Sequence, residues 1–493
     1  MTAVAEEAPP LKWVPREGFP LHKQVYEVMR SAILGGHFRD GDRLPPSRKL
    51  ATNWGLSRAT VAEAYEQLRT EGYVQSRQGS GVYVALTFMH AGQVSLPLHM
   101  NETAPDQTPP RLSRWAHRIT EDHFSALVRP LEPGTPAFDF RPHRVAADLF
   151  PWDAWRVAME RATSREHDAL LRYPPPAGYP PLQQAIAAHV GAYRSVHCQP
   201  EQVMIVNGSL QGMNLLAQLV LDPGDTVAVE DPGYPTARMV FESHDVEVVR
   251  VPVDRDGLQV EHIPANVGLI HVTPSHQDPT GSTLSLSRRL ELLRRAEQAN
   301  ALVMEDDYDS EFRYEGRPVE SLHALDHTGR VLHAGTFSKT FLPGLRMGYM
   351  ILPSSLVGPF VAAKSLRDGG SPLLEQLALA EFIRSGEYER HIRKMRRVYR
   401  QRRDVLVECL DSAFGDRVSI GGRHGGLNIL VALDTPMREA DILAQARAAG
   451  IGLQGAGAYF SKPPERPQLL LGFAGLDEAL IREGVHLLAG IVS

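Results

Sequence analysis

The sequence predicts an α/β protein in two parts: a small N-terminal domain of helices and one hairpin, and a large domain built on a mostly parallel sheet. Length is the first observation, because 493 residues exceed what one hydrophobic core usually holds together. The second is a change of pattern along the chain. Residues 20–85 carry closely spaced helix-start signals, whereas beyond residue 200 short apolar runs alternate with amphipathic helical stretches.

The apolar runs of the large domain define its expected sheet. They read VMIVNG, TVAVEDP, GLIHVTP, ALVMEDD, VLHAGTF and GYMILP, and SLSRRLELLRRAEQAN is a helix between two of them. Uninterrupted apolar strands separated by helices are typical of a parallel sheet covered on both faces. Ligands of such sheets bind where the strands end. The residues that follow each run are therefore the first candidates for a site.

The same pattern sets the expected domain boundaries. Residues 1–19 form a tail, residues 20–85 the small domain and residues 114–493 the large domain. Residues 86–113 are polar and contain several prolines, as in MNETAPDQTPPRLSR, and predict an interdomain linker that extends to residue 136 at most.

Composition excludes several classes of protein. No apolar run approaches the ~18 residues of a membrane span, and the acidic N-terminus does not resemble a secretory signal. The two cysteines, Cys198 and Cys409, form no CxxC pair, which argues against a disulfide framework and against a metal site. We therefore expect a soluble, cytoplasmic protein without membrane contact and without a bound metal.

Charge is distributed unevenly along the chain. Residues 1–85 hold 11 Lys and Arg against 9 Asp and Glu, a net charge of +2, whereas the whole chain carries −6. An acidic protein does not bind nucleic acid over its whole surface. Any contact with DNA is therefore expected near the N-terminus.

Two short helices with a tight turn are predicted in LPPSRKLATNWGLSRATVAEAYEQLRTEGYV. Ser47 and Ser57 are the expected N-caps, and Gly55 lies in the turn between the helices. Two short helices joined in this way make a helix-turn-helix. The alternative is a helical hairpin that docks onto another protein and has no role in DNA binding.

The second of these helices has an apolar face and a polar N-terminal end. The residues expected to face the core are Val61, Ala64, Tyr65 and Leu68. Arg58, Thr60 and Glu63 then point outward at the end that meets base edges in a recognition helix. The following GYVQSRQGSGVYVA predicts a β-hairpin whose turn contains Gly79 and presents Arg77 to a groove or a phosphate.

Residues 20–84 resemble the GntR family of winged helix-turn-helix regulators, through LPPSRKLA, LSRATVAEAY, L-x-x-EGY and RQGSGVYV. The resemblance implies a dimer that reads a repeated or palindromic site on double-stranded DNA. The residues expected at or near the DNA are Arg48, Ser57, Arg58, Thr60, Arg77 and Gly79.

A lysine with unusual surroundings follows one strand of the large domain. GTFSKTFLPGLRMGYMILP places Lys339 after small hydroxyl residues and seven residues before Arg346. A partly desolvated lysine loses its proton and condenses with an aldehyde, and Thr336, Ser338 and Arg346 can donate hydrogen bonds to a phosphate. The alternative is an ordinary surface lysine in a loop rich in hydroxyl groups.

Other strand ends carry groups that suit the same cofactor chemistry. Asp306 can pair with a protonated pyridine nitrogen, and Tyr308 can reach a ring hydroxyl. Asn207, Gly208 and Ser209 open a helix whose free N–H groups favour a phosphate. Tyr234 offers a ring to stack on the cofactor. Taken singly, these residues are equally compatible with a buried acid, an ordinary helix start and a core tyrosine.

From about Arg114 to the C-terminus, the order and spacing of these groups resemble the fold-type I aminotransferases. The resemblance implies pyridoxal 5'-phosphate as cofactor, with Lys339 as its Schiff-base lysine. It also implies roles for Asp306 at the ring nitrogen, Tyr308 at the ring hydroxyl and Tyr234 stacked on the ring. Asn207, Gly208, Ser209, Ser338 and Arg346 would surround the phosphate, and Tyr173 would reach the phosphate of the neighbouring subunit of a dimer.

Together the two halves resemble the MocR/GabR subfamily of GntR regulators, which joins a winged helix to an aminotransferase-like domain. The resemblance implies a transcriptional regulator of an operon for amine, amino-acid or vitamin B6 metabolism. The large domain would form a head-to-tail homodimer and would sense a small amine, or pyridoxal phosphate itself. Two alternatives remain: an active aminotransferase with a DNA-binding appendix, and a large domain that only dimerises.

Two positions depart from the aminotransferase pattern. Asp278 stands in SHQDPTG where aminotransferases have an asparagine close to the cofactor hydroxyl. Leu470, in QLLLGFAGL, stands where enzymes usually have the arginine that grips the substrate carboxylate. Losing that arginine costs on the order of 1.5–3 kcal/mol of hydrogen bonding. We therefore expect sensing and not turnover, with at most a residual transaminase half-reaction.

Overall fold

The computed structural model describes residues 13–16, 18–85, 111–120, 136–165, 167–316 and 320–492. Most of the predicted tail and of the predicted linker lies outside these residues. The chain divides into two compact units, Met1–Arg111 and Leu112–Ser493, and each is described here by itself. None of the helices in the described ranges combines the length and the apolar run that crossing a bilayer requires.

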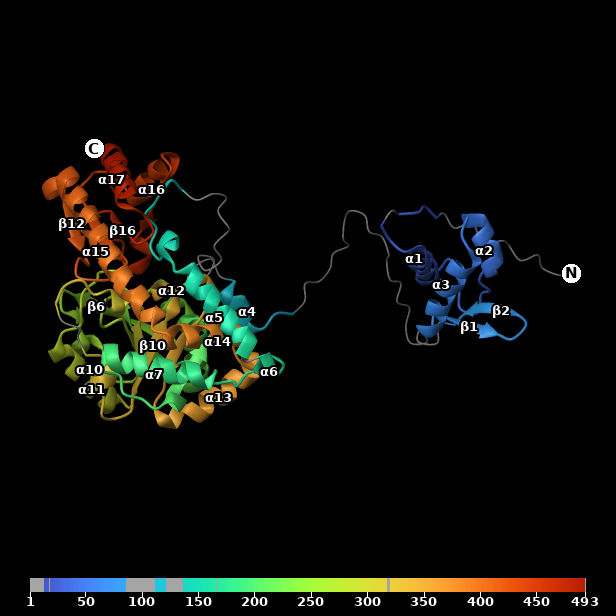
Figure 1. Ribbon diagram of the computed structural model, residues 1–493, viewed down its shortest axis with the longest axis horizontal. Coiled ribbons are helices and arrows are strands. Elements are labelled where there is room, and N and C mark those ends of the chain that lie inside the picture. The colour runs from blue at the N-terminus through green and yellow to red at the C-terminus, as the bar shows by residue number, and fades with distance from the viewer. Residues whose placement is uncertain are drawn as a thin grey trace. The chain divides into compact units, whose positions relative to one another are not determined.

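The N-terminal unit is a winged helix-turn-helix (Figure 1). It consists of α1 (Leu21–Leu34), α2 (Ser47–Trp54), α3 (Arg58–Thr70), β1 (Val74–Arg77) and β2 (Gly81–Val84). The strands form an antiparallel hairpin that pairs Val74 with Val84 and Arg77 with Gly81. The turn between α2 and α3 bends at Gly55, which takes the left-handed φ of 66° that favours glycine. The helix-turn-helix and the hairpin predicted from the sequence are both confirmed.

The predicted helix starts are confirmed at one serine and wrong at the other. The Ser57 side chain accepts a hydrogen bond from the Thr60 N–H at 3.1 Å and caps α3. Ser47 is the first residue of α2, and Pro46 occupies the cap position without a side-chain bond. Proline fixes φ near the extended conformation, so the backbone turns into the helix immediately after Pro46 and leaves the cap position to it.

One apolar cluster holds the N-terminal unit together. The buried face of α3 consists of Val61, Ala64, Tyr65 and Leu68, as the sequence predicts. These side chains pack with Val25, Met29 and Ile33 of α1 and with Val84 of the hairpin. Because the hairpin shares this core, the turn at its tip has a fixed place relative to α3.

The large unit is built on an eight-stranded sheet with the order β4-β11-β10-β9-β8-β5-β6-β7. Its strands are β4 (Val203–Val206), β5 (Thr226–Asp231), β6 (Glu247–Asp254), β7 (Gly257–Leu258), β8 (Val267–Val272), β9 (Leu302–Asp307), β10 (Val331–Thr336) and β11 (Gly348–Ile351). The ladder from β10 through β9, β8 and β5 to β6 is parallel, and β11 is antiparallel to both β10 and β4. The predicted mostly parallel sheet is confirmed.

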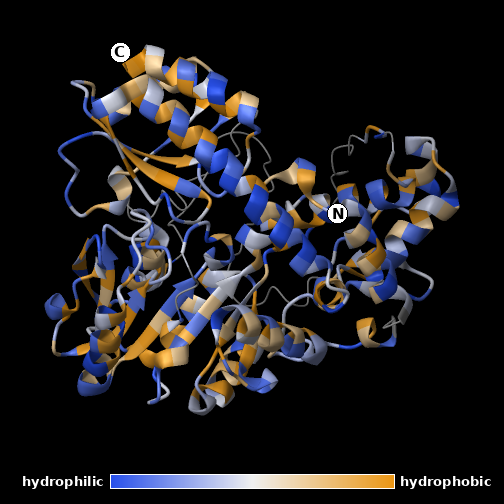
Figure 2. Ribbon diagram, turned by 60° about the vertical axis from the view of Figure 1, so that its left-hand side comes forward, coloured by the Kyte–Doolittle hydropathy of each residue, from blue (hydrophilic) through white to orange (hydrophobic). Residues whose placement is uncertain are grey.

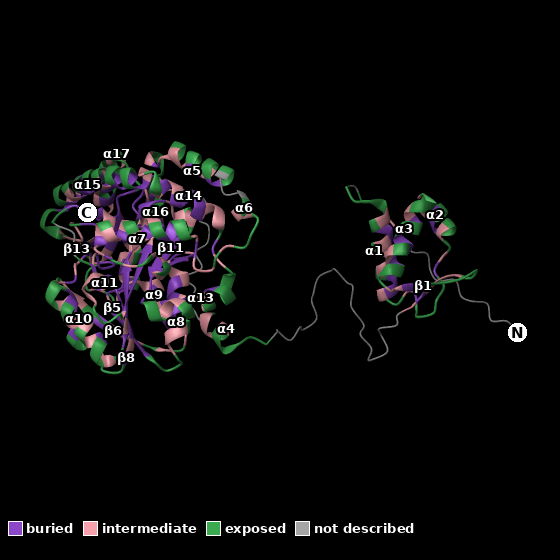
Figure 3. Cartoon of the chain, turned by 60° about the horizontal axis from the view of Figure 1, so that its bottom comes forward, coloured by how far each residue is buried: buried purple, intermediate pink, exposed green. Residues whose placement is uncertain are grey.

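Helices cover both faces of this sheet. The principal ones are α7 (Pro180–Arg194), α8 (Ser209–Val220), α9 (Pro235–Glu242), α10 (Leu286–Ala299) and α13 (Ser354–Asp368). Figure 3 shows the strands as buried ribbon between helices with exposed outer faces. Separate apolar clusters lie on the two sides, one around Leu216 and Phe241 and another around Leu292 and Ile270. Side chains at the strand ends are therefore held on a rigid layer.

A second, four-stranded sheet follows toward the C-terminus. Its order is β12 (Val418–Gly421), β13 (Asn428–Leu433), β16 (Gln468–Gly472) and β15 (Gln454–Gly455). It packs with α15 (Glu387–Phe414), α16 (Glu439–Ala448) and α17 (Glu478–Val492), and Figure 2 shows apolar strands beneath helices banded with polar and apolar residues. An earlier segment, β3 (Phe138–Asp139), pairs in parallel with β14 (Ile451–Gly452). This pairing brings residues near 140 beside the C-terminal sheet.

Candidate functional site

A cavity of about 150 Å³ opens at the carboxyl ends of the parallel strands. Segments that follow β3, β4, β5, β8, β9 and β10 converge on it, as the topology of a parallel sheet requires. The residues that line it are His143, Gly208, Ser209, Leu210, Tyr234, Thr273, Asp278, Asp306, Tyr308, Thr336, Ser338, Lys339 and Arg346.

One end of the cavity suits a dianionic phosphate. Helix α8 begins there with Ser209, and its free N–H groups and dipole favour an anion. Gly208 has a left-handed φ of 81°, and a Cβ on it would lie 2.9 Å from Nη2 of Arg346. A side chain at this position would therefore strain the backbone and displace the guanidinium. Ser338 lies beside it on α12 (Phe337–Thr340), whose first turn is capped by the Thr336 hydroxyl.

Lys339 lies on the cavity wall with part of its side chain open to the cavity. Burial inside the protein lowers the pKa of its ammonium group to about 8, although the Asp278, Asp309 and Asp306 carboxylates oppose the shift. A lower pKa leaves more of the amine neutral at physiological pH. Only the neutral amine attacks an aldehyde, so this lysine is prepared for that reaction.

The cavity is also lined by the carboxylate of Asp306, which has a histidine beside it. Asp306 is buried at the end of β9, and its Oδ2 lies 3.5 Å from Nε2 of His271 on β8. A carboxylate in this position can hold a proton on a pyridine nitrogen. His271 is itself buried in the sheet, so the pair has little freedom to move.

A second polar chain leads away from the cavity through Tyr308. Nδ1 of His276 lies 3.1 Å from the Tyr308 hydroxyl and 3.2 Å from Oδ2 of Asp309. Burial opposes protonation of His276, but the Asp309 carboxylate outweighs it and raises the pKa of the imidazole. Burial raises the pKa of Tyr308 well above its usual value, and the neighbouring acids add to the shift. Tyr308 therefore stays a neutral phenol that can donate a hydrogen bond.

Asp278 is the least usual member of the site. It is 4 % exposed, and its Oδ1 is buried without a hydrogen-bond partner among the described residues. Burial raises the pKa of this carboxyl to about 7, against the opposing influence of Lys339 and His276. A buried oxygen without a partner costs free energy unless a ligand or water satisfies it. A ligand or a water molecule that donates a hydrogen bond to Oδ1 of Asp278 would therefore be stabilised in the cavity.

Most of the cofactor residues predicted from the sequence meet in this cavity. Those that line it are Lys339, Asp306, Tyr308, Tyr234, Gly208, Ser209, Ser338 and Arg346. Asn207 does not line it, because its amide donates to Asp368 at 3.1 Å and its N–H donates to Gln211. Tyr173 is 99 % exposed in the segment before α7 and does not reach this cavity in its own chain.

Sequence reasoning missed three lining residues, His143, Leu210 and Thr273. Leu210 directly follows the predicted residue Ser209, and Thr273 directly follows the last residue of β8. A search one residue wider at each strand end would have included both. His143 has no such signal, because it lies some sixty residues before β4 and arrives through the pairing of β3 with β14.

Leu470 is fully buried in β16, opposite Leu430 of β13. Its neighbours Leu469 and Leu471 belong to the apolar core on one face of the C-terminal sheet. Side chains alternate along a strand, so Leu470 lies on the other face, with Gln454 of β15 as its second strand neighbour. Gln454 donates to the Tyr459 hydroxyl. The side chain at position 470 on this face is thus apolar.

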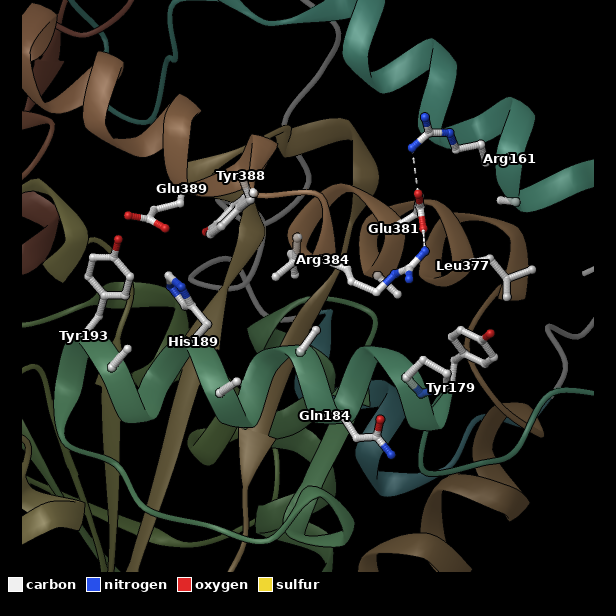
Figure 4. Close-up of a pocket in the computed structure, with 18 residues that line it drawn as sticks. Arg161, Tyr179, Gln184, His189, Tyr193, Leu377, Glu381, Arg384, Tyr388 and Glu389 are labelled. Carbon is white, nitrogen blue, oxygen red and sulfur yellow. Dashed lines mark hydrogen bonds and ion pairs between the residues drawn. The ribbon is translucent and has the colours of Figure 1, made fainter. Parts of the chain in front are cut away.

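A larger hollow lies elsewhere in the unit, between α5 (Trp152–Arg165), α7, α14 (Leu373–Arg384) and the start of α15 (Figure 4). Its most prominent polar feature is a chain in which Arg161 and Arg384 both bind the Glu381 carboxylate. These three charges therefore satisfy one another. No group of three metal-ligating side chains occurs in the part of the chain that the structure describes.

In the N-terminal unit, the predicted DNA-contact residues fall into two groups, and all are exposed except Thr60, which is half-buried. Arg58 and Thr60 lie in the first turn of α3, beyond the Ser57 cap, and Arg48 lies on α2. Arg77 ends β1 with its guanidinium over the Tyr83 ring at 4.6 Å, and Gly79 in the turn has a left-handed φ of 73°. Within the described residues, the guanidinium groups of Arg48 and Arg58 have no ion-pair partner, so both remain available for phosphates or bases.

Two family models match the chain. Residues 21–84 match bacterial regulatory proteins of the gntR family. Residues 145–486 match aminotransferase class I and II.

Full-length relatives combine both parts. A probable rhizopine catabolism regulatory protein of Rhizobium meliloti, MocR, is 35% identical, and the match covers 95% of this chain and 92% of that protein. The HTH-type transcriptional regulator TauR of Rhodobacter capsulatus is 32% identical over 95% of this chain and 96% of its own. The pyridoxine biosynthesis regulator PdxR of Corynebacterium glutamicum is 30% identical, with 96% of each chain covered.

Solved structures match the large unit. A kynurenine aminotransferase of Pyrococcus horikoshii superimposes with a TM-score of 0.70 at 27% identity, covering 77% of this chain and 96% of that one. The α-aminoadipate aminotransferase LysN of Thermus thermophilus gives a TM-score of 0.69 at 26% identity, with 77% and 97% covered.

Proposed function

From the premise that this chain belongs to the MocR-type regulators of the gntR family, in which a DNA-binding winged helix precedes an aminotransferase-like domain, we propose how its two sites work. The protein is a transcriptional regulator. The large unit binds pyridoxal 5'-phosphate in the cavity at the strand ends. It senses a small amine, or the cofactor itself, and does not serve metabolic turnover.

The cavity residues suit each part of the cofactor. Arg346, Ser338, Ser209 and the Gly208 backbone would hold the phosphate, with Asn207 behind them and Tyr173 of a neighbouring subunit in a head-to-tail homodimer. Asp306 would hold the ring nitrogen, Tyr308 the ring hydroxyl and Tyr234 the ring face. When bound, the cofactor supplies an aldehyde that bonds covalently to Lys339 or to an effector amine.

The chemistry around Lys339 argues for an amine without an α-carboxylate. Leu470 supplies no charge to a substrate carboxylate, and the Asp278 carboxylate would repel one held close to the reacting nitrogen. An amine nitrogen, by contrast, donates to the free oxygen of Asp278. The names of relatives refer to rhizopine catabolism and pyridoxine biosynthesis, which supports an amine or vitamin B6 operon as the target.

The DNA-binding surface would be the outer end of α3 with the hairpin beside it. Arg58 and Thr60, at the Ser57-capped end, would read base edges in the major groove, and Arg48 would bind the phosphate backbone. Arg77 and Gly79 would place the hairpin tip against an adjacent groove. Two copies in a dimer would read two half-sites, and an effector that binds one arrangement of the dimer better would shift the regulator toward it.

One observation carries the cofactor proposal: eight residues predicted near separate strand ends, among them a lysine of lowered pKa, line a single cavity. The test is the absorption spectrum of the full-length protein with pyridoxal phosphate, beside a Lys339→Ala variant. We expect a visible band of lysine-bound cofactor that the variant lacks. Identical spectra would contradict the proposal. Repeated turnover of an amino acid with a keto-acid acceptor would favour the aminotransferase alternative instead.

A further inference from the structure

Lys364 is a fully buried lysine on α13, and it lies outside the cavity at the strand ends. Its ammonium group donates to Oδ2 of Asp368 at 2.7 Å and to Oε1 of Gln211 at 3.1 Å. We propose that Lys364 is a positioning residue that keeps residues 207–209 in the conformation that binds the cofactor phosphate, by fixing the orientation of the Gln211 amide. This inference rests on the proposed function and adds a residue that acts on the phosphate from outside the cavity.

Two features of α13 are unfavourable when each is taken alone. The ammonium group of Lys364 has lost its hydration, and this burial lowers its pKa, although the Asp368 carboxylate opposes the shift. Asp368 is the last residue of α13, where the negative end of the helix dipole disfavours a carboxylate. A buried charge persists where partners replace the lost water. The partners of this pair therefore indicate its role.

The Asp368 carboxylate joins the end of α13 to the start of α8. Its Oδ2 accepts hydrogen bonds from the Gln211 amide at 2.7 Å and from the Asn207 amide at 3.1 Å, in addition to the one from Lys364. Its Oδ1 accepts the Gly370 N–H at 2.9 Å. Burial opposes ionisation of Asp368, but its hydrogen-bond donors outweigh it and lower the pKa of the carboxyl. The carboxylate therefore stays charged and keeps these donors in place.

Gln211 connects the buried pair to the phosphate end of the cavity. Its Oε1 accepts the Asn207 N–H at 2.9 Å, while its amide nitrogen donates to Asp368. A lysine can only donate, so Lys364 binds the same oxygen as the Asn207 N–H does. A flipped amide would turn its NH2 group toward these two donors. Lys364 therefore stabilises the one orientation of Gln211 that satisfies the backbone at residue 207.

This orientation leaves the first N–H groups of α8 available to an anion. Gln211 is the third residue of α8, a position whose side chain commonly bonds to the N–H of the cap residue. Here it bonds to the Asn207 N–H instead, and the cap residue Gly208 makes no side-chain bond. The first N–H groups of a helix have no partner within it and favour a phosphate. Without Lys364, Gln211 would be free to turn, and the phosphate would meet less well aligned donors.

The test compares pyridoxal phosphate with pyridoxal, which lacks the phosphate group. Each is titrated into the cofactor-free, full-length protein while the visible band is followed, with the wild type, Lys364→Met and Lys364→Arg. Lys364→Met should raise the half-saturating concentration of pyridoxal phosphate by about tenfold or more, as the loss of a charge-assisted hydrogen bond does. The half-saturating concentration of pyridoxal should not change. Lys364→Arg keeps the charge and the donors and should recover part of the loss.

A double-mutant cycle shows whether Lys364 acts through Gln211. Gln211→Met should produce the same selective loss, and the double variant should lose no more than the larger of the two single losses. Because Gln211→Met leaves the buried pair in place, it tests the proposal even where Lys364→Met does not fold.

Arg288→Met is the matched control for the loss of an ion pair. Nη2 of Arg288, on α10, donates to Oδ2 of Asp254 at 2.7 Å, and neither residue lines the cavity. Melting temperatures record the stability that each variant loses. The control should leave both titrations unchanged.

The outcomes are distinct. A Lys364→Met variant that weakens both ligands equally, or neither of them, overturns the positioning role and leaves cofactor binding standing. A wild type that binds pyridoxal as tightly as pyridoxal phosphate overturns the assignment of the phosphate end, and the role of Lys364 with it. A wild type without a visible band for either ligand overturns the proposed function itself.

Discussion

The proposed DNA-binding surface and the proposed cofactor cavity are built in opposite ways. Arg48, Arg58 and Arg77 are exposed and lie within thirty residues of one another on a small scaffold. The cavity draws buried or half-buried groups from positions 143 to 346, and their protonation depends on one another. A surface of solvated cations tolerates change in its neighbours. A cavity of interacting charges does not, so substitutions in the two regions should differ in size and in what they disturb.

Gly208→Val should have the largest effect. The added Cβ would lie 2.9 Å from Nη2 of Arg346 on a backbone of left-handed φ, so the backbone would be strained and the guanidinium at the phosphate end of the cavity would be displaced. We expect cofactor affinity to fall by about 100-fold or more, in line with the loss of several charge-assisted hydrogen bonds, as measured by titration of the visible band. The matched control is Gly344→Ala, where an added Cβ meets nothing within 4 Å. An equal loss in both variants would contradict the steric explanation.

Arg58→Ala should affect only the DNA-binding surface. Removing a base-contacting arginine weakens specific binding by about 10- to 100-fold, and the cofactor band should not change. Binding to operator DNA by fluorescence anisotropy measures the effect. Arg69→Ala, at the other end of α3 where Arg69 pairs with Glu66 at 2.8 Å, is the control and should bind almost normally. Equal losses in both would indicate a nonspecific charge effect.

Asp278→Asn should alter the pH dependence of the cavity. The ionised Asp278 carboxylate raises the pKa of Lys339, so its removal should lower that pKa further below about 8 and speed the reaction with pyridoxal phosphate at pH 7–8, where this carboxylate is charged, by up to about tenfold. Stopped-flow absorbance across pH measures the shift. An unchanged profile would show that the two groups do not interact.

The same variant tests the stability linked to Asp278. Its folded-state pKa of about 7 lies above the ordinary value of 3.8, so its stabilising contribution is complete below pH 4 and is lost as pH rises through 7. The melting temperature of the cofactor-free wild type should therefore decline over this range more than that of Asp278→Asn. Parallel curves for the two proteins would contradict the buried, partnerless carboxylate.

The smallest expected effect compares two serines of the helix-turn-helix. Ser57 caps α3 through the Thr60 N–H, whereas Ser47 makes no cap bond. Ser57→Ala should cost about 1 kcal/mol of unfolding free energy in the N-terminal unit, and Ser47→Ala only a few tenths. Urea unfolding of the isolated residues 13–85 measures both. Equal losses would favour the original assignment of Ser47 as a cap.

Local patterns were sufficient for the elements and for most of the site. The apolar runs predicted the strands, the helix-start residues predicted α3, and the residues after each strand supplied eight cavity positions. These predictions succeeded because a helix or a strand forms through hydrogen bonds and apolar contacts whose sequence pattern repeats every few residues. A short stretch of sequence is therefore enough to recognise it. The cap of α2 was misplaced, because two consecutive prolines moved the helix start by one position.

The sequence by itself determined the two-part architecture, the parallel sheet, the family and most of the residues that line the cavity at the strand ends. Only the tertiary structure decided that Asp278 faces the cavity with a raised pKa, that Asn207 turns toward Asp368, and that His143 reaches the same cavity from a distant segment. The physical reason is the range of the interactions. Strand and helix signals are local, whereas desolvation and charge coupling depend on which groups the fold brings together from positions far apart in the chain.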